Sequence, residues 1–398
     1  MKWETVKLGD VTDSCLGKML DQSKNKGTPQ PYLANVNVRW GSFDLDDLSE
    51  MRFEEHEQER YGLKYGDLVV CEGGEPGRCA IWKDEIPNMK IQKALHRVRV
   101  HDDMDYHYLF YWFLLAGKHG ALDQYFTGAT IKHMPGDKLK TIEIEKPPLP
   151  VQKRIADTLS AYDELIENNQ KQIKLLEEAA QRLYKEWFID LRFPGHESTP
   201  IHDGIPAGWE RTTVERIAAV LRRGISPTYD SNGDSTVINQ KCIRQTIVDL
   251  GEARKQTKKY PDELNLQNGD TVICSTGDGT LGRVGQIFGE LEKTTLDSHV
   301  TLVRATSDVG TQLLFWTIKS QQAFLQGMGK GSTNQLELSR SVIQELPFIL
   351  PDSNTRMAFE VLAQAIHDKI TAQNKQIIEL QTARDRLLPK LMSGEIEV

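Results

Sequence analysis

The sequence predicts an α+β fold in which two related globular domains alternate with two long helices along 398 residues. Three observations support this prediction. Landmarks of the first half recur in the second half at an offset of about 204 residues, as Lys171 and Lys375 do. Short β-rich runs follow turn residues in the globular parts, and each half closes with a long heptad pattern. The repeat therefore predicts pseudo-twofold symmetry within a single chain.

Length and composition limit the class of protein. A single hydrophobic core rarely grows beyond roughly 250 to 300 residues, so a chain of this length is expected to form at least two domains. Apolar residues make up 39% of the chain and charged residues 27%, as in ordinary globular proteins. No run approaches the roughly 20 apolar residues of a membrane span, and the N-terminal residues lack the apolar core of a signal peptide. We therefore expect a cytoplasmic protein without membrane contact.

The cysteines and histidines indicate neither a disulfide framework nor a metal site. The cysteines are odd in number, scattered and without a CxxC pair, which favours a reducing compartment. They are Cys15, Cys71, Cys79, Cys242 and Cys274. His96, His133 and His299 lack the spacing of metal ligands, so we expect no metal on this chain. The net charge of −8 does not by itself indicate nucleic acid, so any DNA-facing surface must be local.

The two globular domains are expected at residues 1–147 and 207–348. The stretch LKYGDLVVCEGG at 63–74 is answered by LQNGDTVICSTG at 266–277, and both read as a Gly-Asp turn followed by a short strand. The aromatic run YHYLFYWFLLAG at 106–117 predicts a buried helix. Its aromatic side chains are interpreted as core packing rather than as platforms for base stacking.

The two long helices are expected at residues 148–192 and 349–398, with a Pro/Gly-rich linker at 193–206. Their apolar positions recur in alternating steps of four and three, which predicts a coiled coil of about 55 Å. Because each stripe needs a partner, we expect the two helices to pack against each other in opposite directions. The predicted seam comprises Ile155, Leu159, Tyr162, Ile166, Asn169, Ile173, Leu176 and Leu183 in the first helix and Ile366, Ile370, Gln373, Ile377, Leu380 and Leu387 in the second.

Polar residues on these helices have two interpretations. Asn169 and Gln373 occupy the same seam position in the two copies, and we interpret them as residues that fix the register of the helical pair. Acidic residues on the outer faces are expected to be solvated, with docking of a partner protein as the alternative. These acidic residues are Glu164, Glu167, Glu177 and Glu178.

Two kinds of glycine-containing loop are the candidate DNA contacts in each half. One loop ends in a Gly-Arg pair, whose arginine suits bidentate guanine contact or phosphate pairing, and neither loop fits a phosphate-cradling P-loop. The other loop supplies hydroxyls, amides and bare backbone N–H groups. The plainer alternative is that the loops are structural turns and that the arginines form surface salt bridges. The candidates are Glu72, Gly73, Gly74, Gly77, Arg78, Gly128, Thr130, Lys132 and His133 in the first half and Thr276, Asp278, Thr280, Arg283, Gly331, Ser332, Thr333, Asn334 and Gln335 in the second.

Two related domains held apart by a helical pair would contact DNA at two places a set distance apart. A protein with two reading heads reads two half-sites at a spacing that its scaffold sets. The halves have diverged, since Ile131-Lys132-His133 stands where the second half has Asn334-Gln335-Leu336. The target of such a protein would therefore be bipartite and asymmetric.

The phrases PPLPVQKRIADTLSAYDELIENNQKQIKLLEE and RDRLLPKLMSGEI, the YGDLVVCEGGEPGR turn and the twofold repeat resemble type I restriction-modification specificity subunits over essentially the whole chain. The resemblance implies that each globular domain is a target recognition domain and that the helices are antiparallel spacers. It also implies double-stranded DNA as a partner and two modification subunits, which carry S-adenosylmethionine and methylate adenine. Two restriction subunits would supply ATP-driven translocation and cleavage, so ATP and Mg²⁺ are expected on partners and no cofactor on this chain.

The absence of catalytic motifs agrees with a non-catalytic subunit. We find no Asn-Pro-Pro-aromatic or Asp-Pro-Pro-Tyr tetrapeptide of an amino-methyltransferase, no Walker A loop and no HExxH. Three alternatives stay open at this point: a specificity subunit of a methylation-only complex without a restriction subunit, a coiled-coil scaffold that does not bind DNA, and a stand-alone nuclease or methyltransferase.

Overall fold

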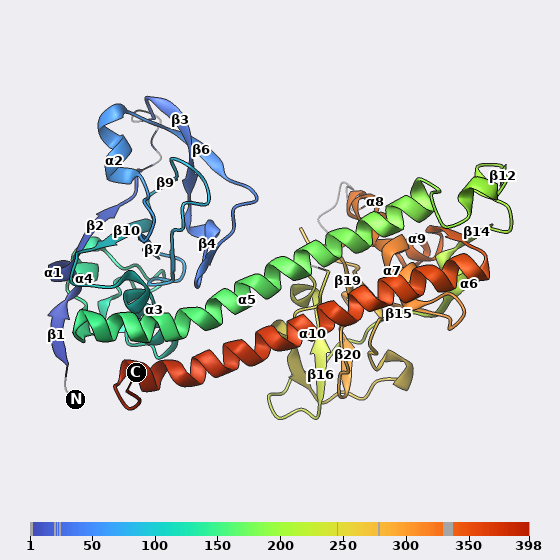
Figure 1. The fold of residues 1–398 in the computed structure, drawn as a ribbon. Coiled ribbons are helices and arrows are strands. Elements are labelled where there is room, and N and C mark those ends of the chain that lie inside the picture. The colour runs from blue at the N-terminus through green and yellow to red at the C-terminus, as the bar shows by residue number, and fades with distance from the viewer. Residues whose placement is uncertain are drawn as a thin grey trace. The chain divides into compact units, whose positions relative to one another are not determined.

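The chain forms two compact α+β units in a computed structural model (Figure 1). Unit 1 comprises Met1–Glu167 and Ile378–Val398, and unit 2 comprises Asn168–Ile377. Helices α5 (Leu149–Tyr184) and α10 (Ser353–Met392) each contribute one part to each unit. The residues described are 3–19, 21, 23, 25–244, 246–277, 279–328 and 337–397.

The described residues of unit 1 form four sheets, the smallest of which pairs β4 (Val38–Arg39) with β5 (Ser42–Phe43). The largest has the order β2 (Thr12–Leu16), β10 (Leu95–Val100), β7 (Leu68–Cys71), β8 (Cys79–Ile81) and is antiparallel. A second has the order β6 (Ser49–Phe53), β3 (Thr28–Leu33), β9 (Lys90–Ile91), with β3 and β9 parallel. Strand β1 (Glu4–Lys7) pairs with β11 (Glu143–Lys146). Shorter elements are α1 (Leu8–Val11), α2 (Gln58–Tyr61) and α4 (Gly136–Lys140).

Unit 2 repeats the same strand orders. Its sheets are β15 (Ala218–Arg223), β21 (Val300–Ala305), β18 (Thr271–Cys274), β19 (Val284–Gln286); then β17 (Arg254–Gln256), β16 (Ser235–Ile238), β20 (Thr294–Leu296); and β14 (Glu210–Thr213) with β22 (Pro347–Leu350). The pair β16 and β20 is again parallel. Further elements are β12 (Ile201–His202), β13 (Ile205–Pro206), α6 (Val214–Ile217), α8 (Gln322–Gly327) and α9 (Arg340–Gln344). The duplication in the sequence is thus a duplication of topology.

One helix in each unit packs its apolar side chains into the core of that unit. Helix α3 (Tyr106–Lys118) buries Tyr108, Phe110, Tyr111 and Phe113, so the interpretation of this aromatic run as a core helix is confirmed. Its counterpart α7 (Thr311–Ser320) buries Phe315, Trp316 and their apolar neighbours in unit 2. Rings that are buried in these cores are not available to stack on bases.

The repeated Gly-Asp turn is held by a repeated ion pair. The Asp67 carboxylate accepts two hydrogen bonds from Arg99, each 2.7 Å, and Asp270 accepts two from Arg304 at 2.7 and 2.6 Å. Each carboxylate also accepts the backbone N–H three residues earlier at 2.8 Å. The paired geometry fixes the turn against the adjacent strand with bidentate, charge-assisted bonds.

The helices run antiparallel within each unit. In unit 2 the Tyr184 ring lies 6.3 Å from the Phe359 ring, and the Asn169 amide donates to Gln376 at 3.2 Å. The Gln373 amide donates to Gln172 one turn away. As the residue number rises on α5, that of its partner on α10 falls. In unit 1 the Arg384 guanidinium continues this series by pairing with Asp163.

The positions of the predicted seam are shielded from solvent. Each of its fourteen positions is buried or half-buried. The buried positions are Ile155, Leu159, Ile166, Asn169, Ile173, Ile370, Gln373 and Ile377. The half-buried positions are Tyr162, Leu176, Leu183, Ile366, Leu380 and Leu387.

Two of the four outward acidic residues contact their own unit: Glu167 pairs with a lysine while its side chain stays 40% exposed, and Glu177 departs from the expectation of solvation. The Glu167 carboxylate lies 2.7 Å from Lys83 Nζ. Glu177 is half-buried beside Thr246 and Lys319, and burial raises the pKa of its carboxyl group. Glu164 and Glu178 are exposed as expected.

A buried histidine anchors α10 to unit 2 and should make the stability of the chain pH-dependent. His367 is 2% exposed, stacks on Phe288 at 4.2 Å, and its ring nitrogens lie 3.1 Å from Gln286 Oε1 and 3.0 Å from Asn268 Oδ1. Burial lowers the pKa of His367 from 6.5 to about 4. Between these two values the unfolded chain binds a proton that the folded chain does not, so stability falls as pH falls.

We expect this histidine to cost on the order of 2 kcal/mol of stability at pH 5 relative to pH 7. Urea unfolding of unit 2 at both pH values would measure the difference. The variant His367→Gln should lose less stability on acidification than the wild type, whereas His202→Gln, at an exposed position, should match the wild type. Equal pH dependence of all three proteins would contradict the role of His367.

Candidate DNA interface

In unit 1 the two candidate loops meet. The backbone of Gly73 forms a bridge with His133, and the N–H of Met134 donates to the carbonyl of Glu72 at 2.7 Å. The second loop closes on itself, because Thr127 and His133 exchange two backbone hydrogen bonds of 2.8 Å. Loops that are far apart in sequence, at 72–78 and 127–133, therefore form one surface.

Two glycines shape this surface. Gly77 has φ +90°, and a Cβ at this position would lie 2.4 Å from Leu122 Cδ1. Gly128 has φ +93°, and a Cβ there would lie 2.3 Å from the carbonyl oxygen of Ile131. Since side chains other than hydrogen would clash at both places, glycine is required for the loops to close. Gly74 is exposed and also has a positive φ of +75°.

Arg78 is held by its own unit. Its guanidinium donates to Glu75 Oε2 at 2.9 Å and to the carbonyl of Asn35 at 3.1 Å. The side chain is 18% exposed. This arrangement is the salt-bridge alternative that the sequence left open for a Gly-Arg turn, and it uses part of the donor capacity of the guanidinium.

A pocket of about 500 Å³ lies between the two loops of unit 1. Its walls mix aromatic, apolar and acidic side chains, among them Trp40, Glu75, Leu122 and Phe126. Exposed Thr130 and Lys132 lie at its edge, and Lys132 pairs with Asp123 at 3.2 Å.

Unit 2 repeats the joining of the loops. The N–H of Leu338 donates to the carbonyl of Ser275 at 2.8 Å, and Thr276 forms a backbone bridge with Glu337. The Thr276 hydroxyl lies 2.6 Å from His299 Nδ1, and the Thr280 hydroxyl donates to the carbonyl of Thr276 at 3.1 Å. Six candidates lie outside the described residues: Asp278, Gly331, Ser332, Thr333, Asn334 and Gln335.

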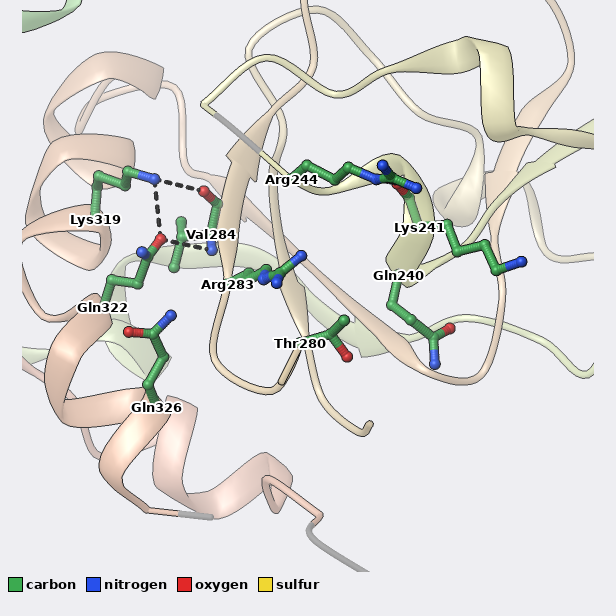
Figure 2. A pocket seen from close by; sticks show the side chains of 9 residues that line it. All are labelled: Gln240, Lys241, Arg244, Thr280, Arg283, Val284, Lys319, Gln322 and Gln326. Carbon is green, nitrogen blue, oxygen red and sulfur yellow. Dashed lines mark hydrogen bonds between the residues drawn. The ribbon is translucent and has the colours of Figure 1, made fainter. Parts of the chain in front are cut away.

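The corresponding pocket of unit 2 has about 490 Å³ and a different lining (Figure 2). Arg283 lies between the helical segment that carries Gln322 and Gln326 and the segment that carries Lys241 and Arg244. The complete lining consists of cations, amides, one hydroxyl and one valine: Gln240, Lys241, Arg244, Thr280, Arg283, Val284, Lys319, Gln322 and Gln326.

The cations of this pocket differ in what they already bind. Lys319 donates to the carbonyl of Val284 at 3.0 Å and to Gln322 at 2.9 Å, and burial lowers the pKa of its ammonium. Arg244 donates to the carbonyl of Lys241 at 3.1 Å. Within the described part of the chain, the guanidinium of Arg283 forms no hydrogen bond or ion pair. A guanidinium carries five N–H donors in a fixed fork.

Sequence reasoning found Arg283 and Thr280 in this pocket and missed its other polar members. Lys241 and Arg244 belong to the stretch INQKCIR, which the repeat aligns with LANVNVRW in the first half. In unit 1 that stretch supplies Asn35, whose carbonyl accepts from Arg78 in the Gly-Arg turn. In unit 2 the short 3-10 helix Gln240–Cys242 supplies Gln240 and Lys241 to the pocket that Arg283 lines. The two cations in this stretch, Lys241 and Arg244, are the sequence signal that could have indicated this part of the pocket.

One group of potential metal ligands occurs among the described residues. Glu54, His56 and Glu57 place potential ligand atoms within 4.8 Å of one another, but the Glu57 carboxylate already pairs with Lys18 and accepts the N–H of Glu54. Acidic clusters of this kind are common without an ion. In the described part of the chain no helix combines the length and apolar character needed to cross a bilayer.

Two α+β units of the same topology, each with a pocket beside its Gly-Arg turn, define a tandem-repeat α+β protein. Residues 1–178 match the family model of the type I restriction modification DNA specificity domain. The MjaIX specificity subunit of a type I restriction enzyme from Methanocaldococcus jannaschii is 26% identical, over 84% of this chain and 78% of its own length. The MjaVIII specificity subunit from the same organism is 24% identical, over 100% and 93%.

A solved structure shares the fold. The type I restriction-modification S subunit from M. genitalium superposes with a TM-score of 0.55 at 15% sequence identity, over 98% of this chain and 96% of that one. Residues 1–178 thus match a type I restriction modification DNA specificity domain, and the chain is similar along most or all of its length to specificity subunits of type I restriction enzymes.

Proposed function

We propose that the two units read the two halves of a bipartite, asymmetric DNA target while two modification subunits, and restriction subunits where they are present, dock on the chain. S-adenosylmethionine, ATP and Mg²⁺ would be bound by those partners. The observation that carries the proposal is the pair of pockets at equivalent places in the two units, which have similar volumes and different linings.

The linings suit different base edges. Arginine binds guanine O6 and N7 in a bidentate manner, and glutamine binds adenine N6 and N7 in the same way. Unit 2 offers Arg283 with Gln240 and Gln326 for such contacts. Unit 1 offers apolar rings that suit thymine methyl groups, beside a Glu75 carboxylate that accepts from Arg78 and from the Trp40 indole N–H. The two halves of the target would therefore differ in sequence.

A domain exchange tests this proposal. Residues 1–147 would be replaced by the same region of a relative, and the methylated sites of the resulting complex would be sequenced. We expect one half of the target to change and the other half to stay. A scaffold that does not read DNA predicts no change in either half, and that result would contradict the proposal.

Arg283→Ala should weaken recognition of one half-site by about 1–3 kcal/mol, since the variant removes from the pocket of unit 2 a guanidinium with no partner among the described residues. Competition binding of the assembled complex to targets with single base changes would measure the effect. Arg216→Ala, at an exposed position on α6, is the matched control and should leave recognition unchanged. A uniform loss of affinity for all sequences would instead make Arg283 a phosphate contact.

A further inference from the structure

An apolar groove in unit 1 has no occupant among the described residues. It has a volume of about 720 Å³ and lies between Trp3, the first turns of α5 and the end of α10. Its apolar walls include Leu149, Val151, Ile155 and Leu391. Grooves of this size and chemistry are typical of sites that bind a ligand or an anchoring side chain.

The equivalent place in unit 2 is filled by the chain itself. After α5, a π-helical turn at Lys185–Ile189 and the following residues direct three aromatic rings onto Trp209 and Phe359. The Trp209 ring lies 4.8 Å from Phe193 and 5.7 Å from Phe188, and the Phe188 ring lies 4.9 Å from Phe359. Trp187 completes the cluster at 5.9 Å from Phe359. All five rings are buried.

Strand pairing establishes that the two places correspond. Glu4 pairs with Lys146 in unit 1, and Glu210 pairs with Leu350 in unit 2, so Trp3 stands where Trp209 stands. The offset of 204 residues then matches the helices. It places Ile155, Leu391, Met392 and Glu397 of unit 1 at the positions of Phe359, Trp187, Phe188 and Phe193 of unit 2.

The groove therefore exists because smaller or polar side chains replace aromatic ones in an otherwise repeated structure. Four of the five aromatic positions of unit 2 carry no ring in unit 1, and only the tryptophan is kept. The kept ring, Trp3, is half-buried, whereas its counterpart Trp209 is 6% exposed. Unit 2 thus shows which chemistry completes this surface.

We propose that the groove of unit 1 receives an aromatic side chain from a partner protein, carried on a short segment with the chemistry of residues 187–193. A second copy of this chain is not the occupant, because the rings of its own segment are buried in unit 2. This docking site is independent of the reading of DNA by the pockets described above.

A peptide with the sequence KEWFIDLRF, residues 185–193, is the probe. Its fluorescently labelled form would be titrated with the full chain in the absence of DNA, with anisotropy as the readout. We expect saturable binding to the wild type and none for a peptide in which Trp187, Phe188 and Phe193 are alanine.

Two variants restore the residues of unit 2 inside the groove. Ile155→Phe and Glu397→Phe should each weaken peptide binding at least tenfold while they keep the melting temperature at or above that of the wild type. Leu165→Phe, at a position on α5 that is 51% exposed, is the matched control and should bind the peptide as the wild type does.

Three results would overturn the proposal. They are the absence of saturable peptide binding to the wild type, equal binding by the wild type and both filled variants, and a self-association of the wild type in sedimentation experiments that the filled variants abolish. Because the peptide assay contains no DNA, its failure would leave the proposed reading of the bipartite target untouched.

Discussion

Lengthening both helices by four residues at the same level is expected to widen the gap between the two DNA half-sites by about two base pairs. The insertions would follow Ile173 in α5 and Ala372 in α10, beside the hydrogen bond that the Gln373 side-chain amide donates to Gln172. Four helical residues add about 6 Å, and B-DNA rises about 3.4 Å per base pair. Sequencing of methylated adenines after expression of the variant with its modification subunit would measure the gap.

A single insertion after Ile173 serves as the contrast. It would displace the end of α5 by about one turn relative to an unchanged α10, so Tyr184 would leave its contact with Phe359. We expect that variant to lose methylation or to alter its spacing. Methylation by the doubly lengthened protein at an unchanged gap would show that the helices do not set the distance between half-sites.

Phe359→Ala is expected to destabilise unit 2 by about 3–5 kcal/mol, the usual cost of removing a fully buried phenylalanine. Its ring is 0% exposed and lies within 6.3 Å of the rings of Tyr184, Trp187 and Phe188. The substitution therefore leaves a cavity where α10 meets the end of α5. Urea unfolding followed by tryptophan fluorescence would measure the loss.

The matched control lies two residues further along the same helix. Val361 is 70% exposed, so Val361→Ala should change stability by about 0.5 kcal/mol or less. If Phe359→Ala cost less than about 1 kcal/mol, the ring would not be packed as described and unit 2 would not provide the template for the groove of unit 1.

Periodic features were predictable from the sequence because they depend on neighbours along the chain. The heptad places Ile155, Ile173 and Ile377 in the seam from their spacing alone, and the composition of residues 106–117 is sufficient to predict a core helix. The amide partners Gln172 and Gln376 were not predicted, because they depend on the offset between two antiparallel helices. That offset is a property of packing and leaves no local pattern.

The candidate site was predictable in its turns and not in its electrostatics. Arg78 and Arg283 follow the same motif, yet Glu75 binds the first guanidinium and Thr280 stands near the second. Lys241 reaches the pocket of Arg283 from a stretch about 40 residues earlier in the chain, through the strand order of the sheets. Such long-range placement is set by the topology and cannot be read from spacing.

The two hydrogen bonds between side-chain amides of α5 and α10 have the symmetry of an assembly of two identical subunits. Asn169 corresponds to Gln373 in the repeat, and Gln172 corresponds to Gln376. The repeat therefore relates the hydrogen bond from Asn169 to Gln376 to the one from Gln373 to Gln172. Each helix supplies one donor and one acceptor, which is the property of an isologous interface, here enclosed within one polypeptide. Such a joint is self-complementary. The pocket lining of each unit can therefore diverge without altering the contact that holds the helices in register.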